Sequence, residues 1–370
     1  MIKKKIFTPG PTQVHPDVLK AIISANVYHR GSEFRELYRR LLVKLKQIFL
    51  TEGNICVLSS SGTGAMETAV SNFCIPGSNA LVINLGRFGQ RWAEICRAYG
   101  ISVTEIKKPY GSSVTPEDIP PDIISDIGTV FLTHTETSTA TVTDIAKMSA
   151  FIKANTDATI ITDAITSVGA IEFRMDEWKV DVAVSASQKG FMTQPGLSII
   201  AFNERALKIS EINPMPRFYF DIRKELKSQL EGLTRWTPAV GLFFGLDKAC
   251  EIILEYGLEN WWEKTSNSAK YFRDFCISSG FKLFSESPSD SITAFSLPDG
   301  MKSSLLINAL KTKHGIIVAN GQAELKDKIV RISHMGDIDC SDTCDLCDVI
   351  TQEFEIIIND NSAPDVIEKD

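Results

Sequence analysis

Hydrophobic and polar positions alternate along this chain in two periods, one typical of strands and one typical of helices. Between Phe34 and Leu50 the apolar residues recur every three or four positions, while arginines and lysines occupy the other faces. This spacing predicts an amphipathic helix. Short runs of apolar and β-branched residues predict buried strands. Such runs occupy 54–59, 81–84, 101–106, 129–133, 158–162, 180–184 and 197–202.

The predicted strands alternate with predicted helices, which indicates an α/β fold built on a mostly parallel, doubly wound sheet. The run at 197–202 follows the preceding strand too closely for a crossover helix, so we expect it to be antiparallel to its neighbours. The sequence TPED at 115–118 predicts a helix start with a capping box. After two long predicted helices, at 239–256 and 258–278, short strands and helices indicate a smaller C-terminal α+β domain.

The length of the chain fits two domains of unequal size. At 370 residues it is too long for one small core. We therefore divide it into an N-terminal arm at 1–20, a large domain at 21–255, a small domain at 256–358 and an acidic tail at 359–370.

Composition narrows the class of protein. Hydrophobic residues make up 44% and charged residues 23% of the chain, which is ordinary for a globular enzyme. The formal net charge of −7 argues against a general nucleic-acid or membrane-surface role. No run of about 18 apolar residues is present, so no transmembrane helix is expected. Three lysines near the start precede no apolar run, so no signal peptide is expected.

The eight cysteines form no disulfide-like framework. Five lie inside apolar patterns, and we expect them to be buried thiols in a reducing cytoplasm. These five are Cys56, Cys74, Cys96, Cys250 and Cys276. Cys340, Cys344 and Cys347 have the spacing of one helical face. Because no histidine or fourth cysteine follows at a zinc-like distance, we expect a packed helix face there and no metal.

Two charged residues follow predicted buried strands, and together they suggest a chemistry. Lys189 comes after the run at 180–184; such a lysine either reaches solvent at the sheet edge or forms a Schiff base with a carbonyl cofactor. Asp163 ends the run at 158–162 and is either a helix cap or the carboxylate that keeps the pyridine nitrogen of pyridoxal phosphate protonated. The pair, 26 residues apart with a strand between, is more specific than either residue alone.

A glycine-rich turn between a predicted strand and a predicted helix is a candidate phosphate cradle. The turn contains Ser61, Gly62, Thr63 and Gly64. Backbone N–H groups at such a turn converge on an anion, and glycine lets the backbone approach closely. An ordinary strand-to-helix turn is the alternative. No GxGxxG or GxxxxGK[ST] pattern competes with it, which argues against a dinucleotide or a P-loop nucleotide.

These motifs resemble those of the class V, fold-type I pyridoxal-phosphate aminotransferases, and within them the alanine–glyoxylate and serine–pyruvate aminotransferase group. The matching pieces span nearly the whole chain in the family's order. They are TPGP, SSSGTGAMETA, LGRFGQRW, LTHTETST, TDAITSVG, SASQKG, PGLSIIAF and VRISHMG. The resemblance implies pyridoxal 5′-phosphate as cofactor, small amino acid and 2-oxo acid substrates, and a homodimer with shared active sites.

The resemblance also assigns roles to individual residues. Lys189 would hold the cofactor and move the proton, and Asp163 would pair with the ring nitrogen. Phe88, where many family members have tryptophan, and Ile165 would cover the two ring faces, although either is otherwise a plain core residue. The residues placed against the cofactor are Ser61, Gly62, Thr63, Gly64, Phe88, Ser138, Thr139, Asp163, Ile165, Gln188, Lys189 and Thr237, with Gly10 and Arg331 at the substrate. Thr237 would serve the partner subunit's phosphate, and Thr234 stands where the family often has tyrosine.

The number of arginines available to bind carboxylates predicts the class of substrate. Arg331 lies within an apolar strand, where it either forms an internal salt bridge or, as the resemblance implies, clamps the substrate carboxylate. We expect no second buried arginine of similar quality, which favours alanine or serine as donor with glyoxylate or pyruvate as acceptor. Arg30, in a loop that approaches the partner in the resembling family, is either an exposed arginine or a second clamp. A cysteine desulfurase or lyase, an aspartate or aminophosphonate transaminase, and a non-catalytic ligand-binding module stay open as alternatives.

Overall fold

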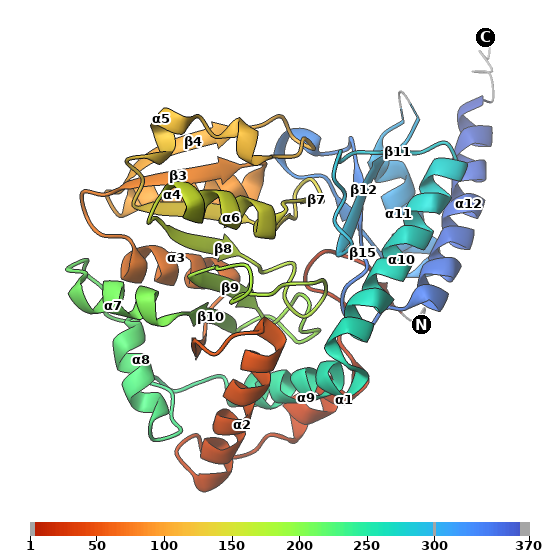
Figure 1. Ribbon diagram of the computed structural model, residues 1–370. Coiled ribbons are helices and arrows are strands. Elements are labelled where there is room, and N and C mark those ends of the chain that lie inside the picture. The colour runs from red at the N-terminus through yellow and green to blue at the C-terminus, as the bar shows by residue number, and fades with distance from the viewer. Residues whose placement is uncertain (1–3, 299–300, 363–370) are drawn as a thin grey trace, which may run out of the picture.

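A seven-stranded sheet forms the centre of the computed structural model, which describes residues 4–298 and 301–362 (Figure 1). The strands lie in the order β2 (Asn54–Leu58), β10 (Ser198–Phe202), β9 (Val182–Ala186), β8 (Thr159–Asp163), β5 (Thr129–Thr133), β3 (Asn79–Asn84) and β4 (Ser102–Lys107). Strand β10 is antiparallel to both its neighbours, and the other neighbouring pairs are parallel. The predicted mostly parallel α/β sheet and the antiparallel run at 197–202 are thus confirmed.

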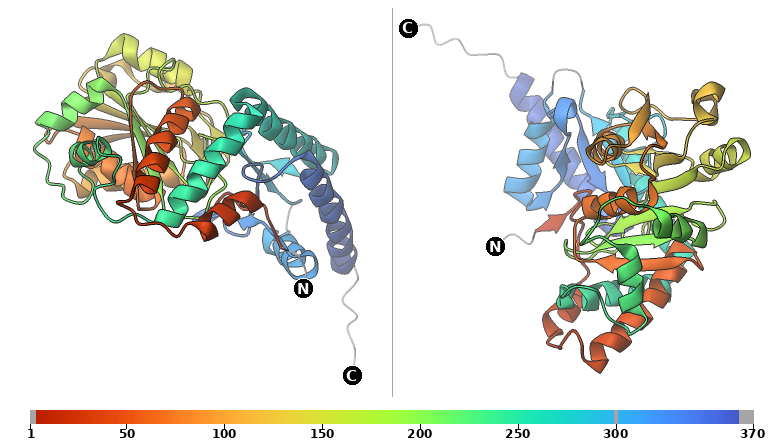
Figure 2. Two further views of the ribbon diagram at one scale, coloured as in Figure 1. Left: turned by 90° about the horizontal axis from the view of Figure 1, so that it is seen from below. Right: turned by 90° about the vertical axis from the view of Figure 1, so that its left-hand side faces the viewer.

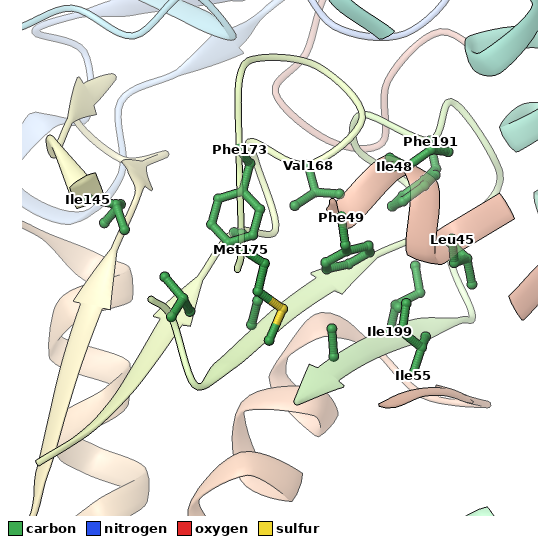
Figure 3. Close-up of a cluster of buried hydrophobic side chains, with 14 of the residues drawn as sticks. Leu45, Ile48, Phe49, Ile55, Ile145, Val168, Phe173, Met175, Phe191 and Ile199 are labelled. Carbon is green, nitrogen blue, oxygen red and sulfur yellow. The ribbon is translucent and has the colours of Figure 1, made fainter. Parts of the chain in front are cut away.

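Helices cover both faces of this sheet because its central strands are apolar on both sides. One face packs against α1 (Pro16–Ser24), α2 (Ser32–Phe49), α6 (Ile145–Asn155) and α9 (Val240–Tyr256). The other packs against α3 (Gly62–Phe73), α4 (Arg87–Ala98), α7 (Glu204–Ile212) and α8 (Ile222–Gln229). Figure 3 shows part of the first core, where Phe49 of α2 meets Phe173 and Phe191 from the loops around β9. The amphipathic pattern of 34–50 accordingly folds as a helix.

The C-terminal part has its own antiparallel sheet, in the order β11 (Lys282–Leu283), β12 (Ile292–Ser296), β15 (Val330–Ser333) and β14 (Ala319–Asn320). Its helices are α10 (Leu258–Ser278), α11 (Ser303–His314) and α12 (Cys340–Ser362). A separate core of aromatic and aliphatic side chains holds these elements together. Strand β1 (Lys5–Ile6) pairs with β13 (Ile316–Ile317), so the N-terminal arm starts beside the C-terminal part before it crosses to α1 (Figure 2).

The helix predicted to begin at Thr115 is not formed as expected. The capping box is present, but it starts only a 3₁₀ turn at Pro116–Asp118, followed by the single helical turn α5 (Pro121–Ile124). Pro120 and Pro121 explain the interruption, because proline lacks an N–H donor and disfavours helical geometry in the residue before it.

The cysteines were expected to be buried or to lie on one helix face, and the last residues to form an acidic tail. The five cysteines expected to be buried are buried. Along α12, Cys340 is exposed, Cys344 is partly buried and Cys347 is buried. Among residues 4–298 and 301–362, no helix is long and apolar enough to cross a membrane. Most of the expected acidic tail lies outside the described residues, and its first residues continue α12.

Candidate active site

A cavity of about 560 Å³ lies where the carboxyl ends of the large sheet's strands meet the N-terminal arm and the small domain. Parallel strands bring their carboxyl ends to one edge, so the segments that follow β2, β3, β5, β8 and β9 converge there. The arm contributes Pro9 and Gly10, and β15 of the small domain contributes Arg331. Nine of the residues predicted from the sequence line the cavity: Gly10, Ser61, Gly62, Thr63, Phe88, Ile165, Gln188, Lys189 and Arg331.

Lys189 is buried in this cavity beneath the N-terminal arm. Its Nζ donates a hydrogen bond to the Pro9 carbonyl at 2.7 Å. Burial lowers the pKa of the Lys189 amine to about 8; Asp163 opposes this shift, while Arg331 and Arg91 add to it. A Cβ on Gly10 would lie 2.5 Å from Lys189 Cε, so glycine is what allows the arm to pass over the lysine.

Asp163 ends β8 and is also buried. Its Oδ1 accepts a hydrogen bond from the Ile165 amide at 2.9 Å. Burial raises the pKa of the Asp163 carboxyl to about 7, against the lowering effect of the Ile165 N–H group. Glu136 raises this pKa further, and Lys189 lowers it. The carboxylate is therefore coupled to the lysine within one electrostatic cluster.

The turn from β2 into α3 forms one wall of the cavity. Ser61 is the N-cap residue of α3, and Gly62 and Thr63 begin the helix. A Cβ on Gly62 would meet Ile165 Cδ1 at 2.7 Å, so this glycine allows close packing of the turn on the strand end. On the facing segment, Gln188 Oε1 is buried and accepts no hydrogen bond from the part of the chain that the structure describes. The amides at the N-terminus of α3 suit a bound anion, whereas the Gln188 Oε1 atom is an acceptor and is open to a donor.

The loop after β5 differs from the prediction. It forms a hairpin of β6 (Thr135–Glu136) and β7 (Thr141–Val142), and its turn directs Thr137 to the cavity. Ser138 and Thr139 are outside the lining: the Ser138 hydroxyl donates to Glu136, and the Thr139 hydroxyl donates to Thr141 Oγ1 at 3.0 Å. The hairpin uses these two hydroxyls internally, which leaves Thr137 as the residue of this loop on the cavity.

Four further predicted residues lie outside the cavity lining, and one of them, Asp163, is buried at the end of β8. Gly64 is one residue farther into α3, where a Cβ would meet the Ser60 side chain at 2.6 Å. Thr237 is exposed and lies in the segment that leads into α9. Arg30 is exposed as well, in the loop before α2. The Thr234 hydroxyl donates to the Trp236 carbonyl at 2.7 Å, so it is satisfied within its own segment.

Glu136 is a buried carboxylate that the sequence analysis did not single out. Its Oε2 accepts hydrogen bonds from the amides of Phe88 and Gly89, both at 3.0 Å. The amide and hydroxyl of Ser138 donate to its Oε1. Burial raises the pKa of Glu136, and these hydrogen bonds oppose the shift. Glu136 thus fixes the first turn of α4 and, with it, the Phe88 ring beside the cavity.

Arg331 is held without an ion pair to any described residue. Its Nη1 donates to the Thr137 carbonyl at 2.9 Å, and its Nε and Nη2 donate to the Asn320 carbonyl at 3.0 and 2.7 Å. Burial lowers the pKa of Arg331 to about 10, while Glu136 raises it. These contacts argue against the internal salt bridge and orient a guanidinium along the cavity wall.

Arg91 also lines the cavity; it is partly buried, whereas Arg331 is buried, and the sequence analysis did not single it out. It lies on α4 three residues after Phe88, and therefore on the same side of the helix. That spacing is visible in the sequence GRFGQRW and was the signal that would have found it. The two arginines reach the cavity from different elements, since Arg91 lies on α4 and Arg331 on β15 of the four-stranded C-terminal sheet.

A buried lysine of lowered pKa, a carboxylate at the end of a nearby strand and a helix N-terminal turn in one α/β crevice are the features that a pyridoxal-phosphate enzyme of fold type I requires. The residues present fit this cofactor, because Ser61, Gly62 and Thr63 at the N-terminal turn of α3 line the cavity, and the amides of a helix N-terminus suit a phosphate. A family model for class-V aminotransferases matches residues 6–336. The chain belongs to this family, and its cofactor is pyridoxal 5′-phosphate.

Individual relatives agree with this family. The chain is 34% identical over 358 residues to an L-aspartate–glyoxylate aminotransferase from Paracoccus denitrificans, covering 94% of this chain and 90% of the relative. It is 31% identical over 350 residues to a serine–glyoxylate aminotransferase from Methylorubrum extorquens, covering 91% and 87%. The crystal structure of an alanine–glyoxylate aminotransferase from Nostoc sp. superposes with a TM-score of 0.90 at 26% identity, covering 96% of each chain.

Asp163→Asn should have opposite effects on the stability of the cofactor-free protein and on its turnover. The folded-state pKa of about 7 exceeds the ordinary value of 3.8, so this carboxyl favours the folded, cofactor-free protein when protonated. That contribution is lost as pH rises from about 4 to about 7. We expect the melting temperature of the cofactor-free variant to gain on that of wild type across this range, while turnover falls on the order of 100-fold or more. A variant with near wild-type turnover would make Asp163 only a cap.

Proposed function

We propose that this protein transfers the amino group of a small amino acid, alanine or serine, to a small 2-oxo acid, glyoxylate or pyruvate. The observation that carries the proposal is that Lys189 and the unpaired Arg331 line one cavity, with Asp163 buried nearby and electrostatically coupled to the lysine. The named activities of the relatives, on aspartate, serine or alanine with glyoxylate, support the same kind of reaction.

Lys189 is the proposed base and anchor. Pyridoxal phosphate, when bound, supplies an electron-accepting ring and carries the amino group between the two substrates. Lys189 moves the proton between the substrate Cα and the cofactor C4′, and its pKa of about 8 leaves a useful neutral fraction near pH 7. Asp163 keeps the ring nitrogen protonated. The Pro9 carbonyl, at 2.7 Å, orients the lysine amine before cofactor binds.

The remaining lining residues are proposed to hold the cofactor in place. Ser61, Gly62, Thr63 and Gln188 receive the phosphate, with Gly64 completing the first turn of α3. The Phe88 ring covers one face of the cofactor ring and Ile165 the other. Thr137, in the place first assigned to Ser138 and Thr139, is the candidate for a contact near the ring because it lines the cavity.

Arg331 is the proposed clamp for the substrate carboxylate, and Gly10 lines the same cavity from the arm that passes over Lys189. Three hydrogen bonds to backbone carbonyls fix the guanidinium while leaving it without a carboxylate partner among the described residues. A fixed, planar donor fork matches a carboxylate better than an ammonium does. The buried position of Arg331 strengthens that interaction because little water screens it.

Arg91 gives the aspartate alternative a specific observation. A dicarboxylate donor requires a cation for its distal charge, and Arg91 is a second arginine on the cavity. The desulfurase alternative lacks such support, since no cysteine is among the described residues that line the cavity. Cys340, which is the exposed cysteine among the described residues, lies at the start of α12.

We further propose that the active unit is a homodimer in which Thr237 completes the partner subunit's site. Thr237 is exposed and does not line the cavity of its own chain. Beside it, Trp236 stacks on Tyr219, with ring centres 5.4 Å apart, and contacts Phe218, which is 71% exposed. Exposed aromatic residues gathered in this way are typical of protein interfaces.

Donor preference and Arg331 provide the first test. Wild-type enzyme should have a higher kcat/KM for alanine or serine than for aspartate or glutamate, with glyoxylate or pyruvate as acceptor. Arg331→Lys should raise KM for every donor by about 10- to 100-fold, because charge-assisted hydrogen bonds are lost. Arg273→Lys is the matched control, since Arg273 pairs with Asp290 in the small domain. A clear preference for aspartate or glutamate would contradict the small-donor proposal.

Mixed dimers test the shared site. Thr237→Glu should weaken cofactor binding at least about 10-fold through charge repulsion with the phosphate, whereas Thr312→Glu on exposed α11 should not. Lys189→Ala alone should be inactive. If sites are shared, mixing the Lys189→Ala and Thr237→Glu proteins should restore activity, because one site of each mixed dimer is then intact. Absence of restoration, with mixed dimers demonstrated by mass spectrometry, would overturn the shared site.

A further inference from the structure

Arg91 is the charged side chain of the cavity for which the proposed roles give no definite task. Its guanidinium carbon lies 4.6 Å from the centre of the Phe88 ring, and its Nη1 donates to Thr63 Oγ1 at 3.1 Å. Arg91 forms no ion pair with any residue in 4–298 or 301–362. The carboxylate one turn away, Glu94, lies instead 4.0 Å from Arg87. A partly buried arginine in this state has donors available for a ligand.

The contact with Thr63 places Arg91 at one end of the cavity. Thr63 belongs to the first turn of α3, where backbone amides carry the positive end of the helix dipole. Arg331 is held from another direction, by carbonyls of the small domain and of the hairpin after β5. The two arginines thus serve different parts of the cavity, and an anion at the α3 turn would meet Arg91 first.

The charged groups around the cavity carry more positive than negative charge, which favours a bound anion. Lys189 is coupled to Arg331 and Arg91 on one side and to Asp163 and Glu136 on the other. Three cationic groups therefore accompany two carboxylates, an excess of one positive charge; burial is the largest cause of the lowered pKa of Lys189, and the two arginines add to it. A phosphate at the α3 turn would balance this excess, and it would do so beside Arg91.

We propose that Arg91 binds the phosphate group of the cofactor, adding a cation to the hydroxyls and amides of the α3 turn. The proposal rests on the proposed function, because it takes the cavity to be the cofactor site. The Phe88 ring holds the guanidinium plane through a cation–π contact, and the planar donor fork matches phosphate oxygens. Glu136 supports this arrangement because it accepts hydrogen bonds from the first turn of α4, the helix that carries Phe88 and Arg91.

The arrangement also affects substrate choice. An Arg91 engaged by phosphate is not available for the distal carboxylate of aspartate or glutamate. The cavity would then offer Arg331 as the arginine for substrate, which is what an alanine or serine donor requires. The assignment of Arg91 therefore removes it as a clamp for the distal carboxylate, which favours the small-donor proposal.

Comparison of pyridoxal phosphate with pyridoxal, which lacks the phosphate, tests the proposal through binding. Cofactor-free proteins are titrated with each aldehyde, and dissociation constants are obtained from absorbance. Arg91→Gln should raise the constant for pyridoxal phosphate by about 10- to 100-fold and that for pyridoxal by less than about 3-fold. Arg91→Lys should fall between Arg91→Gln and wild type. Arg87→Gln, on the exposed side of the same helix, is the matched control and should change neither constant.

Three results would overturn the proposal. An equal loss for both aldehydes would mean that Arg91 acts through the Phe88 ring and not on the phosphate. Unchanged constants would remove Arg91 from cofactor binding, and a KM increase confined to aspartate and glutamate would make it a substrate clamp. Arg91→Lys gives the same comparison if Arg91→Gln does not fold. Failure of the proposed function would give a different result. In that case the wild-type protein itself would bind neither aldehyde, or it would bind them and transfer no amino group.

Discussion

Removal of the Lys189 amine from water is the constraint on which the rest of the site depends. A buried ammonium is costly, so burial shifts this amine towards its neutral, reactive form. The N-terminal arm supplies the cover through the Pro9 carbonyl, and Gly10 is required because any side chain there would collide with the lysine. Asp163 limits the shift by attraction. The resulting pKa of about 8 places the amine within reach of physiological pH.

The fold satisfies this constraint by bringing distant segments to one edge of the large sheet. Asp163 and the segment leading to Lys189 follow β8 and β9, which are neighbouring parallel strands. The arm reaches the site because β1 pairs with β13 of the small domain, which also carries Arg331 on β15. Cofactor site and substrate clamp thus belong to two parts of the chain, and their packing defines the cavity.

Much of this could be predicted from sequence, because strand ends and motif spacing are local properties. Asp163, Lys189 and the Gly62 turn were found in this way, as was antiparallel β10. Thr137 was missed because the turn of the hairpin after β5, which the sequence analysis did not predict, sets which residue lines the cavity; its hydroxyl is bonded to Thr166 Oγ1, 2.7 Å away. Glu136 was missed for a similar reason: its partners are the amides of Phe88 and Gly89, some 48 and 47 positions away. Pro120 and Pro121 did carry a visible signal against the helix predicted from Thr115.

Borohydride reduction tests the central claim, that Lys189 is the amine that binds the cofactor. The purified protein should be yellow, and reduction followed by peptide mapping should find the cofactor on the peptide that contains Lys189, at one cofactor per chain. Lys189→Ala should yield no labelled peptide. Attachment to a different lysine, or no attachment in a protein that is folded and supplied with pyridoxal phosphate, would contradict the account.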